Sequence, residues 1–203
     1  MKDIKAARRH LNRVDRHLGK AIKKIKLENR KLDRSSPYVR LASAIISQQI
    51  STAAARAIWG RFIALFGKND EINFEKLLAM PVETLRGAGV SPQKIGYLKD
   101  LAAKVVANTV PAPAKLKKMS DEEIVEALLP IKGVGVWTIQ MILIFYYRRP
   151  DIWPIRDLGV KKGFMKVHGK SKLPSETALE KFGNKFKPYR SYAALYYWRS
   201  LDN

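Results

Sequence analysis

The chain has 203 residues, and its 39 lysines and arginines outnumber its 18 aspartates and glutamates, which gives a formal net charge of +21. Hydrophobic residues make up 46% of the chain and include four tryptophans, eight tyrosines and seven phenylalanines, so the sequence is not a disordered basic tail. The absence of cysteine excludes disulfides, a catalytic thiol, thiolate zinc sites and a cysteine-ligated iron–sulfur cluster.

The excess of cations predicts a polyanionic partner, most simply nucleic acid, because phosphate binding releases counterions. Solubility alone is the competing explanation of the charge. Residues 1–31 contain no signal-peptide apolar core, and the most apolar run, residues 139–147, is about half the ~20 residues needed to span a bilayer. We therefore expect an intracellular protein of the cytoplasm, nucleoid or eukaryotic nucleus. We expect no membrane partner, and a monomer is the default state.

Nearly every segment has helical periodicity and none alternates with a period of two, so we predict an all-α fold of about ten helices. Apolar residues recur every three or four positions from Ile4 to Ile25, which predicts a basic N-terminal helix within residues 1–36. This helix would pack on a catalytic domain of residues 37–203. Further helices are expected over residues 38–49, 51–66 and 91–106, and a capping box of Ser120 and Glu123 begins a helix that ends near residue 129.

The stretch at about residues 129–138 (LPIKGVGVWT) predicts a tight bend between two helices, since Gly133 and Gly135 tolerate close backbone approach. Backbone N–H groups at the start of the second helix can bind a phosphate, and Lys132 adds charge beside them. This is the arrangement of a helix-hairpin-helix, which binds the DNA backbone without reading sequence. An ordinary corner between two helices would also use such glycines, and this stretch alone does not separate the two interpretations.

A loop with two prolines leads to Asp157, which can cap a helix over residues 158–167. Capping is the ordinary role of such an aspartate, but it is compatible with catalysis because a helix N-terminus favours a charged carboxylate. Asp151 in the same loop is interpreted as a turn residue. Two helices over residues 175–186 and 189–201 follow. In these and earlier helices, some aromatic residues have the spacing of core or surface positions: Trp59, Trp198, Tyr196 and Tyr197.

Four motifs, in order, resemble the helix-hairpin-helix (HhH-GPD) superfamily of base-excision DNA glycosylases, and most closely its 3-methyladenine DNA glycosylase II branch. They are SAIISQQIS at residues 43–51, GAGVSPQK at 87–94, the hairpin at 129–138 followed by PIRDLG at 154–159, and KPYRSYA at 187–193. The resemblance covers roughly residues 37–200. It implies two helical lobes with the active-site cleft between them.

Residue by residue, the resemblance implies that Asp157 is the catalytic aspartate and that Trp137 and Tyr189 are aromatic walls of the base pocket. Gln48 and Gln49 match the loop that enters the duplex, with Gln49 at the wedge position. The resemblance also implies that the DNA backbone is bound by Lys132, Gly133, Val134, Gly135 and Thr138. A monovalent cation, Na⁺ or K⁺, would lie on the carbonyls of Leu129, Ile131 and Val134. The terminal motif contains Arg190 and Ser191, to which no role is assigned.

Trp137 stands where bifunctional relatives carry a lysine whose amine forms a Schiff base, so the resemblance implies no lyase activity. It also implies that no cofactor is required and that there is no iron–sulfur cluster. The expected activity is excision of 3-methyladenine- and 7-methylguanine-type bases from damaged double-stranded DNA. Flipping would be followed by hydrolysis of the N-glycosidic bond, leaving an abasic site in base excision repair. Two alternatives stay open: a non-enzymatic helix-hairpin-helix DNA-binding module, and a glycosylase for oxidised or mismatched bases.

Overall fold

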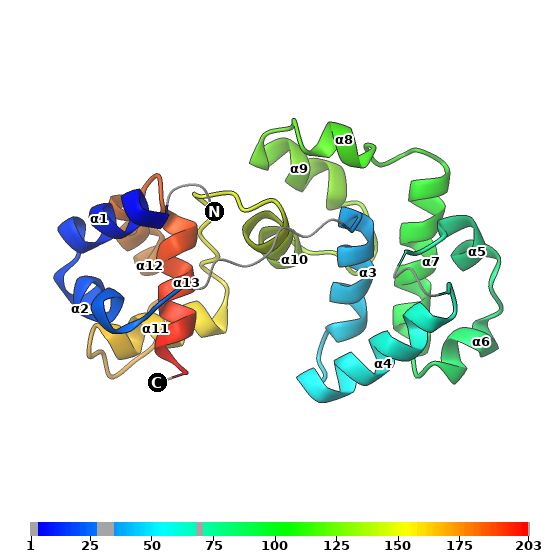
Figure 1. Cartoon of the computed structure of the whole chain (residues 1–203), viewed down its shortest axis with the longest axis horizontal. Helices are drawn as coiled ribbons and strands as arrows, with labels where there is room; N and C mark the ends of the chain where they lie inside the picture. The colour runs from blue at the N-terminus through cyan, green and yellow to red at the C-terminus, as the bar shows by residue number, and fades with distance from the viewer. Residues whose placement is uncertain (1–3, 28–34, 68–70, 203) are drawn as a thin grey trace. The chain divides into compact units, whose positions relative to one another are not determined.

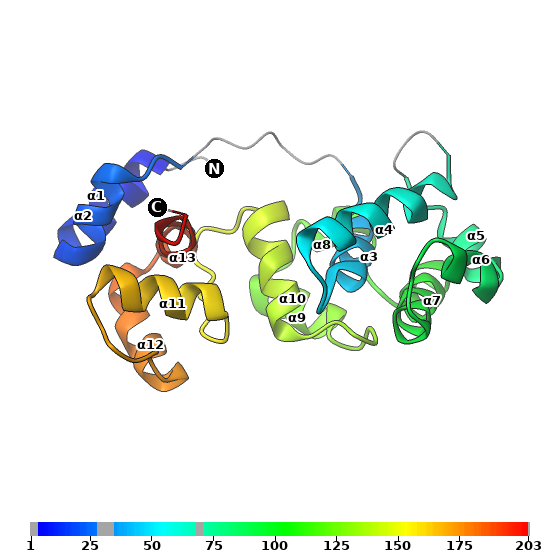
Figure 2. The same cartoon turned by 90° about the horizontal axis from the view of Figure 1, so that it is seen from below.

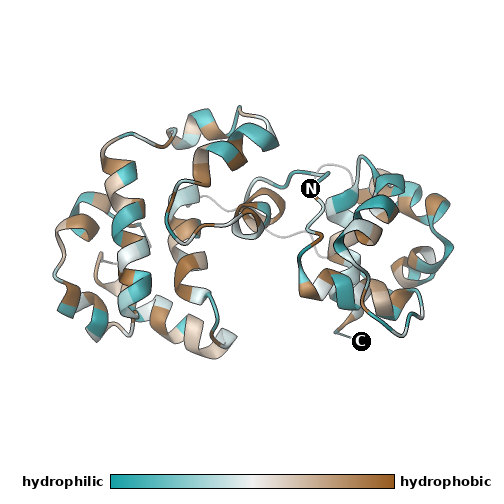
Figure 3. Ribbon diagram, turned by 180° about the vertical axis from the view of Figure 1, so that it is seen from behind, coloured by the Kyte–Doolittle hydropathy of each residue, from teal (hydrophilic) through white to brown (hydrophobic). Residues whose placement is uncertain are grey.

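The computed structural model describes residues 4–27, 35–67 and 71–202, and within these ranges the chain is helical and contains no strand. The predicted all-α class is confirmed (Figure 1). The chain divides into two compact units: a terminal unit, Met1–Leu32 with Leu143–Asn203, and a central unit, Asp33–Ile142. Most helices carry both hydrophobic and hydrophilic residues (Figure 3), as expected of helices that bury one face. No helix in the described ranges is long and apolar enough to cross a bilayer.

The central unit is organised around its longest helix, α7 (Pro92–Val106), which packs against α3, α5 and α6 (Figure 2). Its apolar core includes fully buried leucines of α7, Leu98 and Leu101. The other helices of this unit are α3 (Pro37–Ser47), α4 (Thr52–Ala64), α5 (Phe74–Ala79), α6 (Val82–Gly87), α8 (Pro113–Leu116), α9 (Asp121–Leu128) and α10 (Val136–Met141).

The starts of these helices follow the local sequence. The Ser91 hydroxyl accepts the backbone N–H of Lys94, and Pro92 occupies the first turn of α7. At α9, the Ser120 hydroxyl and the Glu123 carboxylate each accept the other residue's backbone N–H, which confirms the predicted capping box.

The terminal unit is built around α13 (Arg190–Ser200), most of whose residues are buried. Helix α13 packs on α11 (Leu158–Val167), where a Cβ on Gly163 would lie 2.2 Å from the carbonyl oxygen of Tyr197. Only glycine lets the two helix backbones approach so closely. The remaining elements are α1 (Ile4–Val14), α2 (Arg16–Lys24), the π-helical turn η1 (Ile142–Tyr146), α12 (Glu176–Gly183) and the 3-10 turn η2 (Asn184–Phe186).

The single N-terminal helix predicted from Ile4 to Ile25 is wrong, because the chain breaks into α1 and α2 at Asp15. The Asp15 backbone is extended, and its carboxylate accepts the Leu18 backbone N–H at 2.9 Å. A side chain that caps a new helix in this way competes with continuation of the old one. Leu11 and Leu18, on either side of the break, are both fully buried in the core of the terminal unit.

Candidate active site and DNA-binding elements

Asp157 caps α11 in the terminal unit. Its Oδ1 accepts the backbone N–H of Val160 at 2.7 Å, and its own backbone N–H donates to the carbonyl of Pro154 at 3.0 Å. The residue is only 8% exposed. The predicted helix cap is therefore confirmed, and the cap holds a nearly buried carboxylate at the positive end of the helix dipole.

Trp198 of α13 donates its indole N–H to the same Oδ1 of Asp157, also at 2.7 Å. The Phe145 ring packs on the indole, with ring centroids 5.4 Å apart. A Cβ on Gly159 would lie 2.7 Å from Trp198 Cδ1 and 3.1 Å from Asp157 Oδ1, so this position must be glycine for the indole to reach the carboxylate. Two N–H donors on one oxygen orient the carboxylate and complement a negative charge.

Trp198 lies in the candidate site beside Asp157, although its helical spacing predicts an ordinary core or surface position. The glycine two residues after Asp157 is the one local signal, because it leaves room for a large neighbour. The sequence does not show which side chain fills that room.

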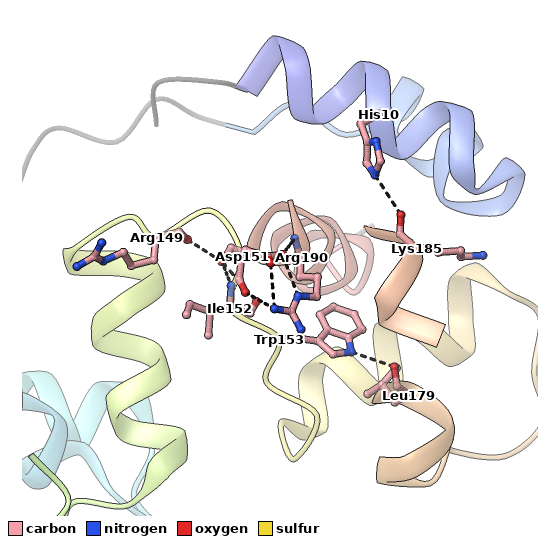
Figure 4. Close-up of polar contacts among 9 residues, drawn as sticks. His10, Arg149, Asp151, Ile152, Trp153, Leu179, Lys185 and Arg190 are labelled. Atoms are coloured by element: carbon pink, nitrogen blue, oxygen red, sulfur yellow. Dashed lines mark hydrogen bonds and ion pairs between the residues drawn. The ribbon is translucent and has the colours of Figure 1, made fainter. Parts of the chain in front are cut away.

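The loop that leads to Asp157 is anchored by Arg190 and Ser191, the two residues of the terminal motif without an assigned role. The Arg190 guanidinium donates to both carboxylate oxygens of Asp151, at 2.8 and 2.9 Å (Figure 4). The Ser191 hydroxyl donates to the carbonyl of Arg149 at 2.7 Å and accepts the backbone N–H of Ile152 at 2.8 Å. Asp151 is therefore one half of an ion pair rather than only a turn residue.

Tyr189, predicted to line the base pocket, precedes α13 and is half-buried. Its ring contacts His10 of α1, with centroids 5.5 Å apart, and Tyr192, with centroids 6.0 Å apart. Its role as a pocket wall stays a prediction.

The hairpin of the central unit connects α9 to α10. Gly133 has a φ of +77°, and a Cβ there would lie 2.2 Å from Cδ2 of the Tyr97 ring, so both the turn and the packing require glycine. The Lys132 backbone N–H donates to Asp100 Oδ2 at 2.8 Å. The N-cap residue of α10 is Gly135, which has no side chain. The backbone N–H groups in the first turn of α10 therefore receive no hydrogen bond from a capping side chain.

The predicted backbone-binding residues differ in exposure. The Lys132 side chain is exposed, whereas Val134 and Thr138 are buried and support the turn. Trp137, predicted as a wall of the base pocket, follows the hairpin and is 45% exposed. The Ile131 carbonyl accepts the Val134 N–H within the turn at 3.0 Å. A carbonyl has two lone pairs, so this bond is compatible with the predicted cation site on Leu129, Ile131 and Val134.

The two glutamines of the predicted wedge loop have different environments. The Gln48 side chain turns to the hairpin, where its Nε2 donates to the carbonyl of Gly133 at 2.8 Å. Gln49 is exposed and has a φ of +56°, an uncommon value for a residue other than glycine. Of the two, Gln49 is the one whose exposed side chain suits insertion into a duplex.

An all-α chain with a two-glycine hairpin and a buried, helix-capping aspartate further along has the architecture of a helix-hairpin-helix DNA glycosylase. The family model described as "HhH-GPD superfamily base excision DNA repair protein" matches residues 42–188. The chain belongs to this superfamily.

Its relatives include two proteins of Schizosaccharomyces pombe. DNA-3-methyladenine glycosylase 1 is 32% identical over 193 residues, which cover 94% of this chain and 85% of the relative. The alkylbase DNA glycosidase-like protein mag2 is 34% identical over 199 residues, which cover 97% of this chain and 93% of the relative. The solved structure of the S. pombe 3-methyladenine DNA glycosylase Mag1 in complex with abasic DNA matches with a TM-score of 0.88 at 32% identity, covering 98% of this chain and 97% of that one.

Proposed function

We propose that this chain is a DNA glycosylase of base excision repair that removes alkylated bases of the 3-methyladenine and 7-methylguanine type from double-stranded DNA. The observation that carries the proposal is the buried carboxylate of Asp157, held by the N–H groups of Val160 and Trp198 at 2.7 Å each. The substrate class is supported by relatives that are named 3-methyladenine DNA glycosylases and are similar to this chain over nearly its whole length.

One carboxylate is sufficient for such a substrate. A base alkylated at a ring nitrogen is already cationic, so it leaves without protonation by a general acid. Asp157 then stabilises the oxocarbenium-like sugar and orients the attacking water. Asp151, the other carboxylate of the loop, is paired with Arg190 and has a structural role instead.

The product is an abasic site in an intact strand. A lyase reaction needs an amine nucleophile to form a Schiff base, and Trp137 provides none. The reaction requires no cofactor, and its C1′–N bond is cleaved by water.

The central unit supplies the DNA contacts. Backbone N–H groups of the hairpin and the Lys132 ammonium bind phosphate, with Na⁺ or K⁺ on the carbonyls of Leu129, Ile131 and Val134 as a bridge. Gln49 enters the duplex, and the Trp137 ring stacks on the flipped base. In the terminal unit, Tyr189 is proposed as a second aromatic residue that contacts this base. We further infer that the protein acts in the compartment that holds the DNA, the cytoplasm or nucleoid of a bacterium or the nucleus of a eukaryote.

Mass spectrometry of the bases released from methylated DNA tests the proposal, with wild type compared with Asp157→Asn. The wild type should release alkylated bases, and Asp157→Asn should release almost none while still binding DNA. Asp202→Asn is the control, since this exposed carboxylate of the same unit pairs only with Arg199 in the described structure. Full release by Asp157→Asn would instead favour another catalytic group, and no release by the wild type would favour a DNA-binding module. A covalent DNA adduct under borohydride would indicate a lyase that acts on other lesions.

A further inference from the structure

One face of α7 carries three side chains that hold both DNA-contacting elements of the central unit. Lys94, Tyr97 and Asp100 are spaced three residues apart, so they follow one another along the same side of the helix. Lys94 is the last residue of the GAGVSPQK motif at residues 87–94, which contributes no residue to the proposed function above. We define these three residues as the α7 platform.

Lys94 holds the wedge loop. Its ammonium donates to the carbonyls of Ile46 and Gln48, at 2.7 and 2.8 Å. Carbonyls at the end of a helix have no partner within the helix, and a lysine ammonium near the helix C-terminus can donate hydrogen bonds to them. The Gln48 carbonyl belongs to the peptide unit that enters Gln49, so this contact fixes the backbone just before the exposed side chain with positive φ.

The other two residues of the platform hold the hairpin. The ring of Tyr97 lies against Gly133, where a Cβ would come within 2.2 Å of it. Asp100 accepts the Lys132 backbone N–H at 2.8 Å through Oδ2, while its Oδ1 pairs with Lys104 at 2.8 Å. The hairpin therefore rests on α7 by a ring contact and by a charge-assisted hydrogen bond.

The wedge loop and the hairpin also contact each other directly. The Gln48 amide donates to the Gly133 carbonyl at 2.8 Å, between residues 85 positions apart in the chain. With the α7 platform beneath both, the two elements form one connected network.

We propose that Lys94 is a positioning residue for base extrusion: it holds the Gln49 loop at a fixed place relative to the hairpin. When the hairpin binds the DNA backbone, Gln49 is then already placed opposite the base stack that it enters. A loop that is ordered before DNA binds loses little conformational entropy on insertion, so more of the binding energy is available to extrude the base. The inference rests on the proposed glycosylase function.

A purely structural role for Lys94 predicts a different outcome, and Lys99 provides the matched control. Lys99 lies on the same helix, is half-buried like Lys94, and donates to the carbonyls of Leu78 and Met80 at the end of α5. Burial lowers the pKa of both ammonium groups. The two lysines therefore have the same chemistry, but only Lys94 holds the wedge loop.

The test compares Lys94→Met and Lys99→Met in the full chain. Single-turnover excision of 7-methylguanine is measured in a fully paired duplex and in a duplex where the lesion lies in an unpaired bubble. Both variants should lose similar thermal stability. Lys94→Met should excise from the paired duplex about tenfold more slowly, equivalent to about 1.4 kcal/mol, and Lys99→Met at the wild-type rate. The defect of Lys94→Met should shrink in the bubble, because extrusion there costs little. Lys94→Arg, which keeps a cation with several donors, should recover part of the rate.

Two results would overturn the inference: equal rates for Lys94→Met and Lys99→Met, or a Lys94→Met defect that is as large in the bubble as in the paired duplex. Failure of the proposed function is a separate outcome, in which the wild type releases no alkylated base from either substrate. Insertion of the loop is then measured by 2-aminopurine fluorescence beside an abasic analogue. Lys94→Met must lower that signal relative to Lys99→Met, and an equal signal would refute the positioning role.

Discussion

Replacing Trp198 with phenylalanine isolates the hydrogen bond that the sequence did not reveal. The change removes the indole N–H that donates to Asp157 Oδ1 at 2.7 Å and keeps an aromatic ring beside Phe145. The Asp157 carboxylate still accepts the Val160 N–H and caps the helix, so α11 should begin at the same residue. Asp157 would lose one of the two N–H donors that hold Oδ1, and its carboxylate would be less well oriented toward the sugar.

The size of the effect follows from the kind of bond lost. A hydrogen bond to a charged group contributes about 1.5 to 3 kcal/mol. If most of this is expressed in the transition state, the excision rate should fall about 10- to 100-fold. The folded state should lose about the same 1.5 to 3 kcal/mol, which lowers the melting temperature by roughly 3 to 12 °C in a chain of this size.

Single-turnover excision, affinity for abasic DNA and thermal melting are measured together for this variant. Trp153→Phe is the control, because Trp153 also donates its indole N–H to a buried acceptor, the Leu179 carbonyl at 2.9 Å, in the same unit. Both variants should melt earlier, but only Trp198→Phe should excise more slowly at unchanged affinity. If Trp198→Phe excises at the rate of Trp153→Phe, the indole does not position Asp157.

Four further outcomes are expected. Gly159→Ala, whose Cβ would lie 2.7 Å from the Trp198 ring, should slow single-turnover excision at least about tenfold, and a wild-type rate would show that the ring can move aside. Arg190→Lys loses the two-point contact with Asp151 and should lower the melting temperature by about 2 to 4 °C, so an unchanged melting temperature would contradict the anchoring role. Burial lowers the pKa of His168 from 6.5 to about 4 in the folded chain. Between pH 6.5 and pH 4 the imidazole is therefore protonated in the unfolded chain but not in the folded one, and the free energy of unfolding should fall as the pH drops through this window. Denaturant unfolding at both ends of the window should show a loss of about 3 kcal/mol that His168→Gln lacks, and an equal loss in that variant would assign it to other groups. In a plot of the logarithm of the binding constant for undamaged duplex against the logarithm of the salt concentration, the slope should be about −0.9 per phosphate neutralised. A binding constant that does not change with salt would show that the +21 net charge does not drive DNA binding.

Features set by neighbouring residues were predictable from the sequence. The capping box of Ser120 and Glu123, the start of α7 at Ser91 and the cap at Asp157 each depend on side chains within three residues of the helix start. The hairpin was predictable for the same reason, because two close glycines between helical segments determine a local turn.

Contacts between distant segments were not predictable in this way. Trp198 and Asp157 are 41 positions apart, and Arg190 and Asp151 are 39 apart. Helical periodicity indicates which face of a helix is buried but not which polar group that face meets. The break at Asp15 was missed for a related reason, since the apolar repeat continues across it and both halves face the same core.

We propose that a single carboxylate, that of Asp157, is responsible for base release in a chain that binds DNA through other groups. The most direct measurement is the single-turnover excision rate of wild type and Asp157→Asn on a duplex with one 7-methylguanine, together with their affinity for that duplex. Asp157→Asn should excise at least about 10²- to 10³-fold more slowly. Its affinity should stay within about threefold of wild type, because phosphate contacts hold the DNA. Excision by Asp157→Asn at the wild-type rate, or a loss of excision that only follows a loss of binding, would contradict the claim.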